Sequence, residues 1–91
     1  MKPTWFAAER FRRYTLSAAR AEVDMYLAAW NEAGEAKGAR AARAGALLGI
    51  SERRFWYGLR AARERYVAAA KDCNVTPDAA LFGTPETALR G

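Results

Sequence analysis

Residues 44–60, AGALLGISERRFWYGLR, decide the fold of this 91-residue chain. The pattern predicts a helix of small residues that ends at Leu48, followed by a break at Gly49-Ile50. Ser51 is a favourable first cap for a second helix, because its hydroxyl can accept from the free N–H groups of the next turn. Gly45 lies four residues before the break, where two crossing helices leave almost no room for a side chain.

The second helix has one apolar face and one polar face. Phe55 and Leu59 lie four residues apart on the same face and are predicted to fill the angle between the two helices. The residues predicted to point away from that plug are polar or aromatic: Ser51, Glu52, Arg53, Trp56, Tyr57 and Arg60. This distribution is typical of a helix-turn-helix.

Residues 40–62 resemble the helix-turn-helix at the end of Fis (the factor for inversion stimulation) and of the NtrC-like activators. That family shows a small residue, an apolar pair, Gly-Ile, a polar cap, Arg and two apolar residues four apart. The matching positions here are Gly45, Leu47-Leu48, Gly49-Ile50, Ser51, Arg53, Phe55 and Leu59. The chain departs from the family at Gly45, where Ala is preferred, and at Gly58, which costs the helix about 1 kcal/mol relative to Ala. The resemblance implies DNA binding, and a tight helical hairpin in an all-α protein is the alternative.

Length and composition predict one small all-α domain. Hydrophobic residues make up 52% of the chain, which is enough for one core but not two. We expect four helices in a bundle that contains the helix-turn-helix, with short C-terminal turns and no β-sheet. Cys73 is the only cysteine and cannot form an internal disulfide. No segment has the length of a transmembrane helix or the pattern of a signal peptide, so we expect a soluble, cytoplasmic protein without membrane contact.

The sequence contains no histidine, which removes the commonest general base and the commonest metal ligand. Its carboxylates are scattered, and it has neither a phosphate-binding loop nor a nucleophile elbow. We therefore expect no catalytic residues, no metal site and no cofactor. The chain is not predicted to be an enzyme.

Positive charge is concentrated in the middle of the chain. The net charge is +5, but residues 1–36 sum to zero and residues 66–91 to −1, whereas residues 37–65 carry eight basic and two acidic groups. The eight basic residues are Lys37, Arg40, Arg43, Arg53, Arg54, Arg60, Arg63 and Arg65. Arginine suits phosphate groups and guanine edges better than lysine does. The excess charge therefore coincides with the helix-turn-helix.

The N-terminal third is predicted to form two helices, over about 5–14 and 17–33, with a break near Ser17. A single helix from 4 to 33 is the alternative. Aromatic residues are dense at its start, and we expect them to close one side of the core or a dimer seam, with a nucleic-acid stacking surface as the alternative. They are Trp5, Phe6, Phe11 and Tyr14.

The remaining chain completes a single domain over 1–91. Its parts are residues 1–36 for the core or dimerisation, 39–72 for the helix-turn-helix, and 73–91 as a tail. The helices are predicted over about 39–48 and over about 51–72, the second being some 32 Å long. The tail repeats the pattern Thr-Pro-acid at Thr76 and Thr84, which is typical of a helix start. We expect Leu81 and Phe82 to dock on the core.

Within the helix-turn-helix, Arg53 is predicted to contact guanine and Tyr57 a thymine methyl or a phosphate. The residues predicted to contact the DNA backbone are Arg40, Arg43, Arg60 and Arg63, and the predicted surface also includes Arg54 on its flank and Ser51 at the helix start. Trp56 is included in the predicted surface, but half-burial against residues 17–33 is the role we favour for it; stacking on a sugar and a dimer contact are the alternatives. Gly58 is predicted to bring the helix closer either to DNA or to another helix.

The predicted partner is double-stranded DNA. One helix-turn-helix covers only about 600–1,000 Å² of DNA, so we also expect a homodimer. Its interface would involve either the aromatic N-terminal segment or the far half of the helix over 51–72. The function predicted is that of a small bacterial, phage or plasmid transcription regulator. The alternative is an all-α protein-binding module, such as a phage-type inhibitor or a subunit of a larger complex, that uses the Arg, Trp and Tyr side chains.

Overall fold

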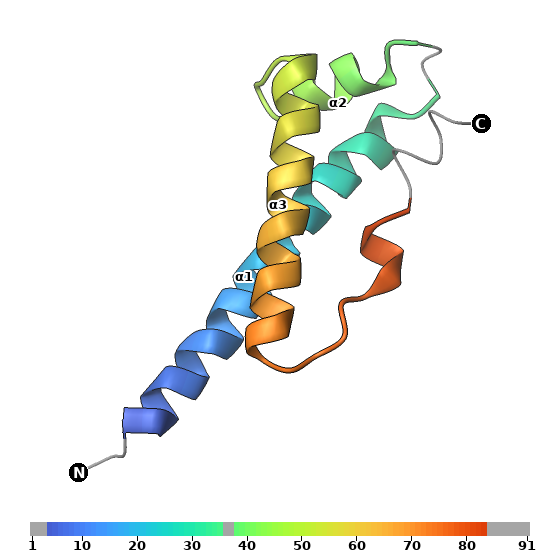
Figure 1. The fold of residues 1–91 in the computed structure, drawn as a ribbon. Coiled ribbons are helices and arrows are strands. Elements are labelled where there is room, and N and C mark those ends of the chain that lie inside the picture. The colour runs from blue at the N-terminus through green and yellow to red at the C-terminus, as the bar shows by residue number, and fades with distance from the viewer. Residues whose placement is uncertain (1–3, 36–37, 84–91) are drawn as a thin grey trace.

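The protein is all-helical over the residues that the computed structural model describes, 4–35 and 38–83. These residues form three α-helices, α1 (Thr4–Ala33), α2 (Arg40–Leu47) and α3 (Glu52–Asp72), and one 3-10 turn, η1 (Ala79–Leu81) (Figure 1). The predicted all-α class is confirmed. The predicted number of four α-helices is not, because the N-terminal pair is one helix. None of the helices in the described ranges is both long and apolar enough to cross a membrane.

α1 runs through the point where a break was predicted near Ser17. The Thr15 hydroxyl donates to the carbonyl of Phe11 one turn earlier, at 2.9 Å, instead of accepting from a backbone N–H as a cap would. The helix contains neither glycine nor proline, so nothing in its backbone favours a break. The apolar face changes at this point for another reason, which is that α1 leaves the body of the protein here.

The core lies where α1 crosses α3. Phe55 and Leu59 on α3 are fully buried, as is Val23 on α1, and Trp30 is 2% exposed. The Phe55 ring stacks on Trp30 at a centroid distance of 6.2 Å and meets Tyr26 edge-on at 5.7 Å. Aromatic pairs of this kind add about 0.5–1.5 kcal/mol beyond the area that they bury. Phe55 and Leu59 are buried as predicted, and the ring contacts of Phe55 join α3 to α1, whereas the sequence predicted that these residues fill the angle between the two helices of the helix-turn-helix.

The turn between α2 and α3 is a Schellman motif. Gly49 adopts φ +72°, and its N–H donates to the carbonyl of Ala46 at 3.0 Å. The N–H of Ile50 donates to the carbonyl of Gly45 at 2.9 Å, so two carbonyls at the end of α2 are satisfied. A Cβ on Gly45 would lie 2.8 Å from the Ile50 carbonyl oxygen. The predicted break at Gly49-Ile50 is confirmed, and Gly45 leaves room for the turn itself.

The C-terminal segment folds back from the end of α3 along the body (Figure 1). Leu81 is buried and the Phe82 ring stacks on Tyr66 at 5.9 Å, which confirms that both residues dock on the core. Thr76 does not cap the turn. Asp78 does so, because its carboxylate accepts from a backbone N–H two residues later, while its own N–H donates to the Tyr66 hydroxyl. The second Thr-Pro unit, at Thr84, lies outside the described residues.

The molecule is elongated, with extents of 57 × 25 × 18 Å. Its radius of gyration is 15.6 Å, whereas about 12 Å is typical of a compact chain of this length. The N-terminal part of α1 extends beyond the other helices (Figure 1). Phe11 and Tyr14 lie there and are 69% and 71% exposed, so they do not close the core of a single chain. The side chains of Trp5 and Phe6 lie outside the described ones.

α1 approaches α3 most closely at Gly58. A Cβ there would lie 2.2 Å from the Tyr26 hydroxyl oxygen and 2.6 Å from the ring carbon that bears it. Of the two alternatives left open by the sequence, the glycine therefore makes room for another helix.

This close approach predicts that the effect of Gly58→Ala on the free energy of unfolding depends on whether Tyr26 is present, which a double-mutant cycle measures. Gly58→Ala should lower the free energy of unfolding by about 1–2 kcal/mol, because the Tyr26 ring must leave its place against Phe55. In a Tyr26→Ala background the same change should be neutral or stabilising by up to about 1 kcal/mol, the helix propensity gained. Urea unfolding followed by circular dichroism measures both, and equal effects in the two backgrounds would contradict the close approach.

Candidate nucleic-acid interface

The N-terminal end of α3 is capped as the sequence predicts. Ser51 has an extended backbone (φ −73°, ψ 164°), and its hydroxyl oxygen accepts from the N–H of Arg54 at 3.2 Å. Glu52 supplies the acidic residue that favours the positive end of the helix dipole. Both side chains are exposed, so the first turn of α3 begins at the surface with its direction fixed.

Four exposed side chains follow over the next turns of α3, and we call them the arginine–tyrosine face. They are Arg53, Arg54, Tyr57 and Arg60. Steps of 100° per residue place Arg53, Tyr57 and Arg60 opposite Phe55, which anchors the helix to the core. Tyr57 is 58% exposed, and the Arg53 guanidinium lies 5.5 Å from the centre of its ring. The contact holds both groups on the outer surface of α3.

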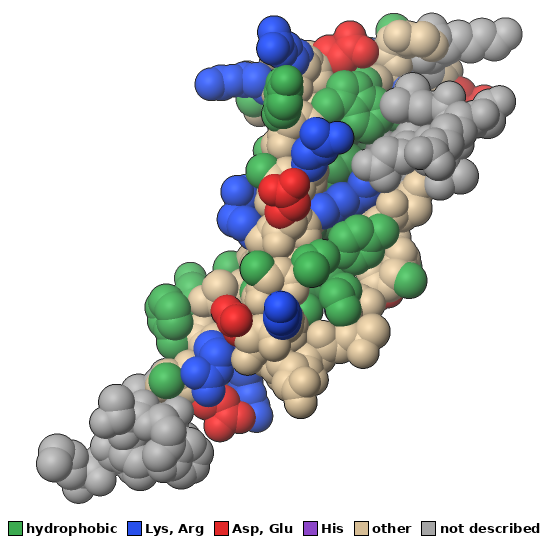
Figure 2. All heavy atoms as spheres, viewed as in Figure 1, with side chains coloured by type: hydrophobic (Ala, Val, Ile, Leu, Met, Phe, Trp, Pro, Cys, Tyr) green, Lys and Arg blue, Asp and Glu red, His purple; other side chains and the backbone are tan. Residues whose placement is uncertain are grey.

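The arginines of this face are not neutralised by acidic side chains of the described residues. Within the part of the chain that the structure describes, neither Arg54 nor Arg60 forms an ion pair, and neither does the exposed Arg43 on α2. Exposed arginines elsewhere do so, in the pairs Arg13–Glu9, Arg20–Asp78 and Arg65–Glu22. Figure 2 shows Lys and Arg side chains projecting from the end of the molecule where α2 meets α3, with acidic ones among them.

Arg40 does not belong to the arginine–tyrosine face or its surroundings, although the sequence predicted that it would contact a phosphate. Its Nε donates to the Trp30 carbonyl at 2.9 Å, and its guanidinium lies 4.4 Å from the centre of the Trp30 ring. The side chain is half-buried. Arg40 thus satisfies a carbonyl near the C-terminal end of α1 and holds the start of α2 against it.

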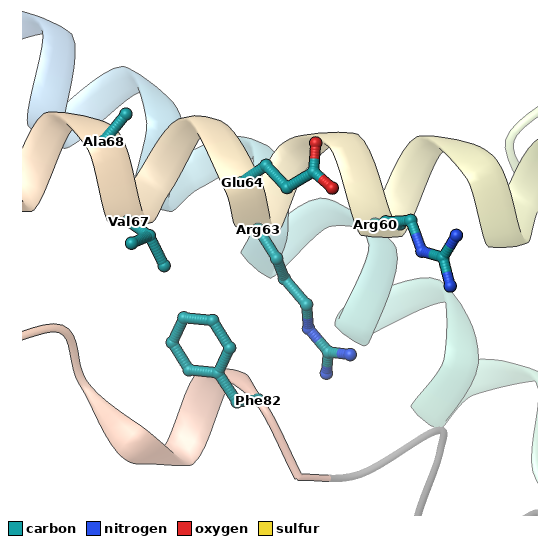
Figure 3. Close-up of a pocket in the computed structure, with 6 residues that line it drawn as sticks. All are labelled: Arg60, Arg63, Glu64, Val67, Ala68 and Phe82. Carbon is teal, nitrogen blue, oxygen red and sulfur yellow. The ribbon is translucent and has the colours of Figure 1, made fainter.

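Arg63 also departs from its predicted role as a phosphate contact, because it is only 6% exposed. Its Nε donates to the Leu81 carbonyl at 2.9 Å, and its guanidinium lies 5.8 Å from the centre of the Phe82 ring. Figure 3 shows the Arg63 side chain running from α3 towards the C-terminal segment, with Arg60 about one turn further along α3. Arg63 therefore fastens that segment to α3.

Trp56 packs inside rather than outside. It is half-buried, with its ring 5.6 Å from Trp30 and 5.5 Å from Phe55. Of the three alternatives weighed from the sequence, this is half-burial against residues 17–33. The stacking of Trp56 on a DNA sugar does not fit this packing.

Sequence reasoning missed a groove beside the arginine–tyrosine face. It has a volume of about 380 Å³ and lies between α3 and the C-terminal segment (Figure 3). Val67, which is 43% exposed, and Phe82 give it an apolar lining, and Glu64 stands at its edge. The acidic Glu64 follows Arg60 by four residues on the same face of α3, so the uncompensated positive charge ends there. The signal in the sequence that could have indicated this groove is Val67, an apolar residue on a side of α3 that is otherwise polar.

Comparisons of this chain with protein-family models, with curated proteins and with solved structures give no match. The resemblance of residues 40–62 to the Fis and NtrC-like type stays a prediction that rests on those residues. No three His, Cys, Asp or Glu side chains within 4–35 and 38–83 are placed to hold a metal ion.

The different environments of Arg63 and Arg60 predict different effects on stability. Arg63→Ala should lower the free energy of unfolding by about 2–3 kcal/mol, because the buried Leu81 carbonyl loses its donor and the C-terminal segment its anchor. Arg60→Ala, one turn earlier on α3 and exposed, should change it by less than about 0.5 kcal/mol. Urea denaturation of the two variants tests this, and similar losses would show that Arg63 is not an anchor.

Proposed function

We propose that this protein binds double-stranded DNA through a helix-turn-helix formed by α2, the turn at Gly49-Ile50 and α3. The first turns of α3 would lie in the major groove. The observation that carries the proposal is the arginine–tyrosine face, which stands exposed on the free end of a capped helix while the opposite side of that helix is anchored in the core. Such a rigid, cationic helix end suits a groove lined by phosphates.

Each side chain of the face has a role that follows from its chemistry. Arg53 would donate two hydrogen bonds to guanine O6 and N7, which contributes about 1–3 kcal/mol of discrimination. Tyr57 would contact a thymine methyl or a phosphate. Arg54 and Arg60 would bind backbone phosphates on either side, together with Arg43 from α2. Ser51 directs the helix end, where backbone N–H groups and the helix dipole favour an anion.

The later turns of α3 would not contact DNA bases, and they hold the N-terminal end of the helix in place. The helix is 21 residues long, about 32 Å, and only its first two or three turns would fit against bases. Its later turns bury Ala62, Tyr66 and Ala69 against the rest of the protein. Because Arg40, Arg63 and Trp56 have packing roles, the proposed contact set is smaller than the set predicted from the sequence.

A small regulator of transcription, of bacterial, phage or plasmid type, is the function that fits these features. A single module covers about 600–1,000 Å² of DNA, which is little for a specific site. Two copies would read half-sites about one helical turn apart and double the contact. We therefore propose a homodimer as the DNA-binding form.

The proposal predicts that three arginines carry most of the affinity. Replacing Arg53, Arg54 and Arg60 together by Ala should lower affinity for duplex DNA at least about 100-fold and reduce the slope of log K against log salt by about 2 to 3. The matched control replaces Arg13, Arg20 and Arg65 by Ala. It removes the same charge from arginines that are already ion-paired, and it should change affinity only slightly. Fluorescence anisotropy across a salt series measures both.

Equal losses in the two triple variants would mean that net charge alone drives binding, and the proposed face would be wrong. Weak binding of the unaltered protein with no sequence preference would favour the alternative function. In that case the same arginine and tyrosine side chains would serve as anchors for an acidic partner protein.

A second prediction concerns sequence preference. Arg53→Lys keeps the charge but loses the planar two-donor geometry, so discrimination between a selected site and the same site with its guanine replaced should fall by about 1–3 kcal/mol. Arg60→Lys should leave discrimination nearly unchanged, because a phosphate accepts either cation. Selection from a random duplex pool supplies the site, and competition binding measures the ratio. Unchanged discrimination with Arg53→Lys would remove Arg53 from base reading.

A further inference from the structure

α1 carries a second apolar stripe on the side that faces away from the core, and we call it the outer stripe. Its members recur at spacings of three and four residues: Phe11, Tyr14, Ala18, Ala21, Met25 and Ala28. All six are exposed, with Phe11 at 69%, Tyr14 at 71% and Met25 at 46%. This is the heptad pattern of a helix that packs lengthwise against another helix.

The core-facing stripe of α1 stands opposite. Leu16, Val23 and Trp30 follow each other at intervals of seven residues and pack into the body of the protein. In the heptad that the outer stripe defines, these three residues occupy the position farthest from the outer stripe. A surface helix ordinarily shows one apolar stripe, and a helix that is apolar on two opposite sides is one covered from both.

We infer that a second copy of this chain covers the outer stripe, with the two α1 helices packed antiparallel. The stripe begins with two large residues, Phe11 and Tyr14, and continues with two small ones, Ala18 and Ala21, so the large pair of one copy meets the small pair of the other only when the helices are antiparallel. If the helices cross near residue 16, Tyr14 of one copy lies beside Ala18 of the other, and Phe11 lies beside Ala21. Parallel helices in register would instead place ring against ring and alanine against alanine, leaving gaps between them.

Charge favours the same direction. Residues 9–13 of α1 carry three arginines and one glutamate, whereas residues 20–24 carry one arginine and two acids. The antiparallel arrangement sets the basic part of each helix beside the acidic part of the other. A parallel pair would align basic with basic and acidic with acidic. The macrodipoles of the two helices also oppose each other in the antiparallel pair.

The exposed rings of the outer stripe would supply a substantial part of the area that a stable dimer needs. Aromatic side chains bury about 150–250 Å² each, so the exposed fractions of Phe11 and Tyr14 correspond to roughly 400–700 Å² over the four rings of two copies. Ala18 and Ala21 of each copy add to this. Stable interfaces bury about 1,200 Å² or more in total, so the four rings would supply about a third to a half of what such an interface needs.

The antiparallel pair does not rest on the proposed function. The arginine–tyrosine face lies on the side of α3 opposite Phe55, which packs against α1, so an interface between two α1 helices leaves the face open.

Self-association of the full chain without DNA tests the interface. Sedimentation equilibrium over a concentration series should show the mass rising from 10.1 kDa to twice that value. The Phe11→Glu/Tyr14→Glu variant should remain monomeric at every concentration while its circular dichroism keeps a helical spectrum, because both side chains are exposed. The control Tyr57→Glu changes an exposed aromatic outside the stripe and should still dimerise.

A monomeric wild type, or a dimer that survives Phe11→Glu/Tyr14→Glu, would overturn the interface. If Val67→Glu abolished such a surviving dimer, the contact would belong to the far half of α3. These results involve no DNA, so they are separate from the failure of DNA binding.

Cysteine pairing tests the direction of the helices. Tyr14→Cys and Ala18→Cys are made separately in a Cys73→Ser background, mixed in equal amounts and oxidised. Antiparallel helices should give mainly the mixed disulfide between positions 14 and 18, identified by mass spectrometry. Disulfides that join position 14 to 14 and 18 to 18 would show parallel helices and overturn the proposed register.

Discussion

The packing of Phe55 against Tyr26 and Trp30 is the contact on which the rest of this structure depends. It joins the start of α3 to the C-terminal half of α1, and the buried Ala41 and Ala44 of α2 close the same cluster. Because Phe55 is fully buried on one side of α3, the residues on the opposite side have to face solvent. The arginine–tyrosine face is a consequence of that anchor. A chain that lost it would also lose the defined direction of α3.

Local signals in the sequence were sufficient for the turn and for α3. Ser51 caps the helix, the chain turns at Gly49-Ile50, and Phe55 and Leu59 are buried, all as their types and spacing predict. Each of these features depends on residues within a few positions of one another. The sequence could therefore fix where α3 begins and which of its sides faces outwards.

The errors concern groups whose partners are distant in the chain. Arg63 was predicted on the surface, but it bonds a carbonyl 18 residues away, and Arg40 bonds one 10 residues before it. The residue type and helical spacing of a basic side chain are the same whether it faces solvent or packs on another segment. Helical spacing therefore could not identify the partner of either arginine. Likewise, the change of apolar face in α1 indicated a break, whereas α1 is one helix of 30 residues whose N-terminal part extends beyond the other helices (Figure 1).

The length of α1 connects the two proposals. A 30-residue helix spans about 45 Å, which exceeds what the body of a 91-residue chain can cover. Its C-terminal half serves the core, through Val23 and Trp30, and leaves Phe11 and Tyr14 in water. Exposing two large rings is unfavourable for a lone chain, since each buried aromatic contributes about 1.5–3 kcal/mol. In the proposed dimer a second copy would remove those rings from water without touching α3, so the same helix would organise the core of one chain and form the interface with the next.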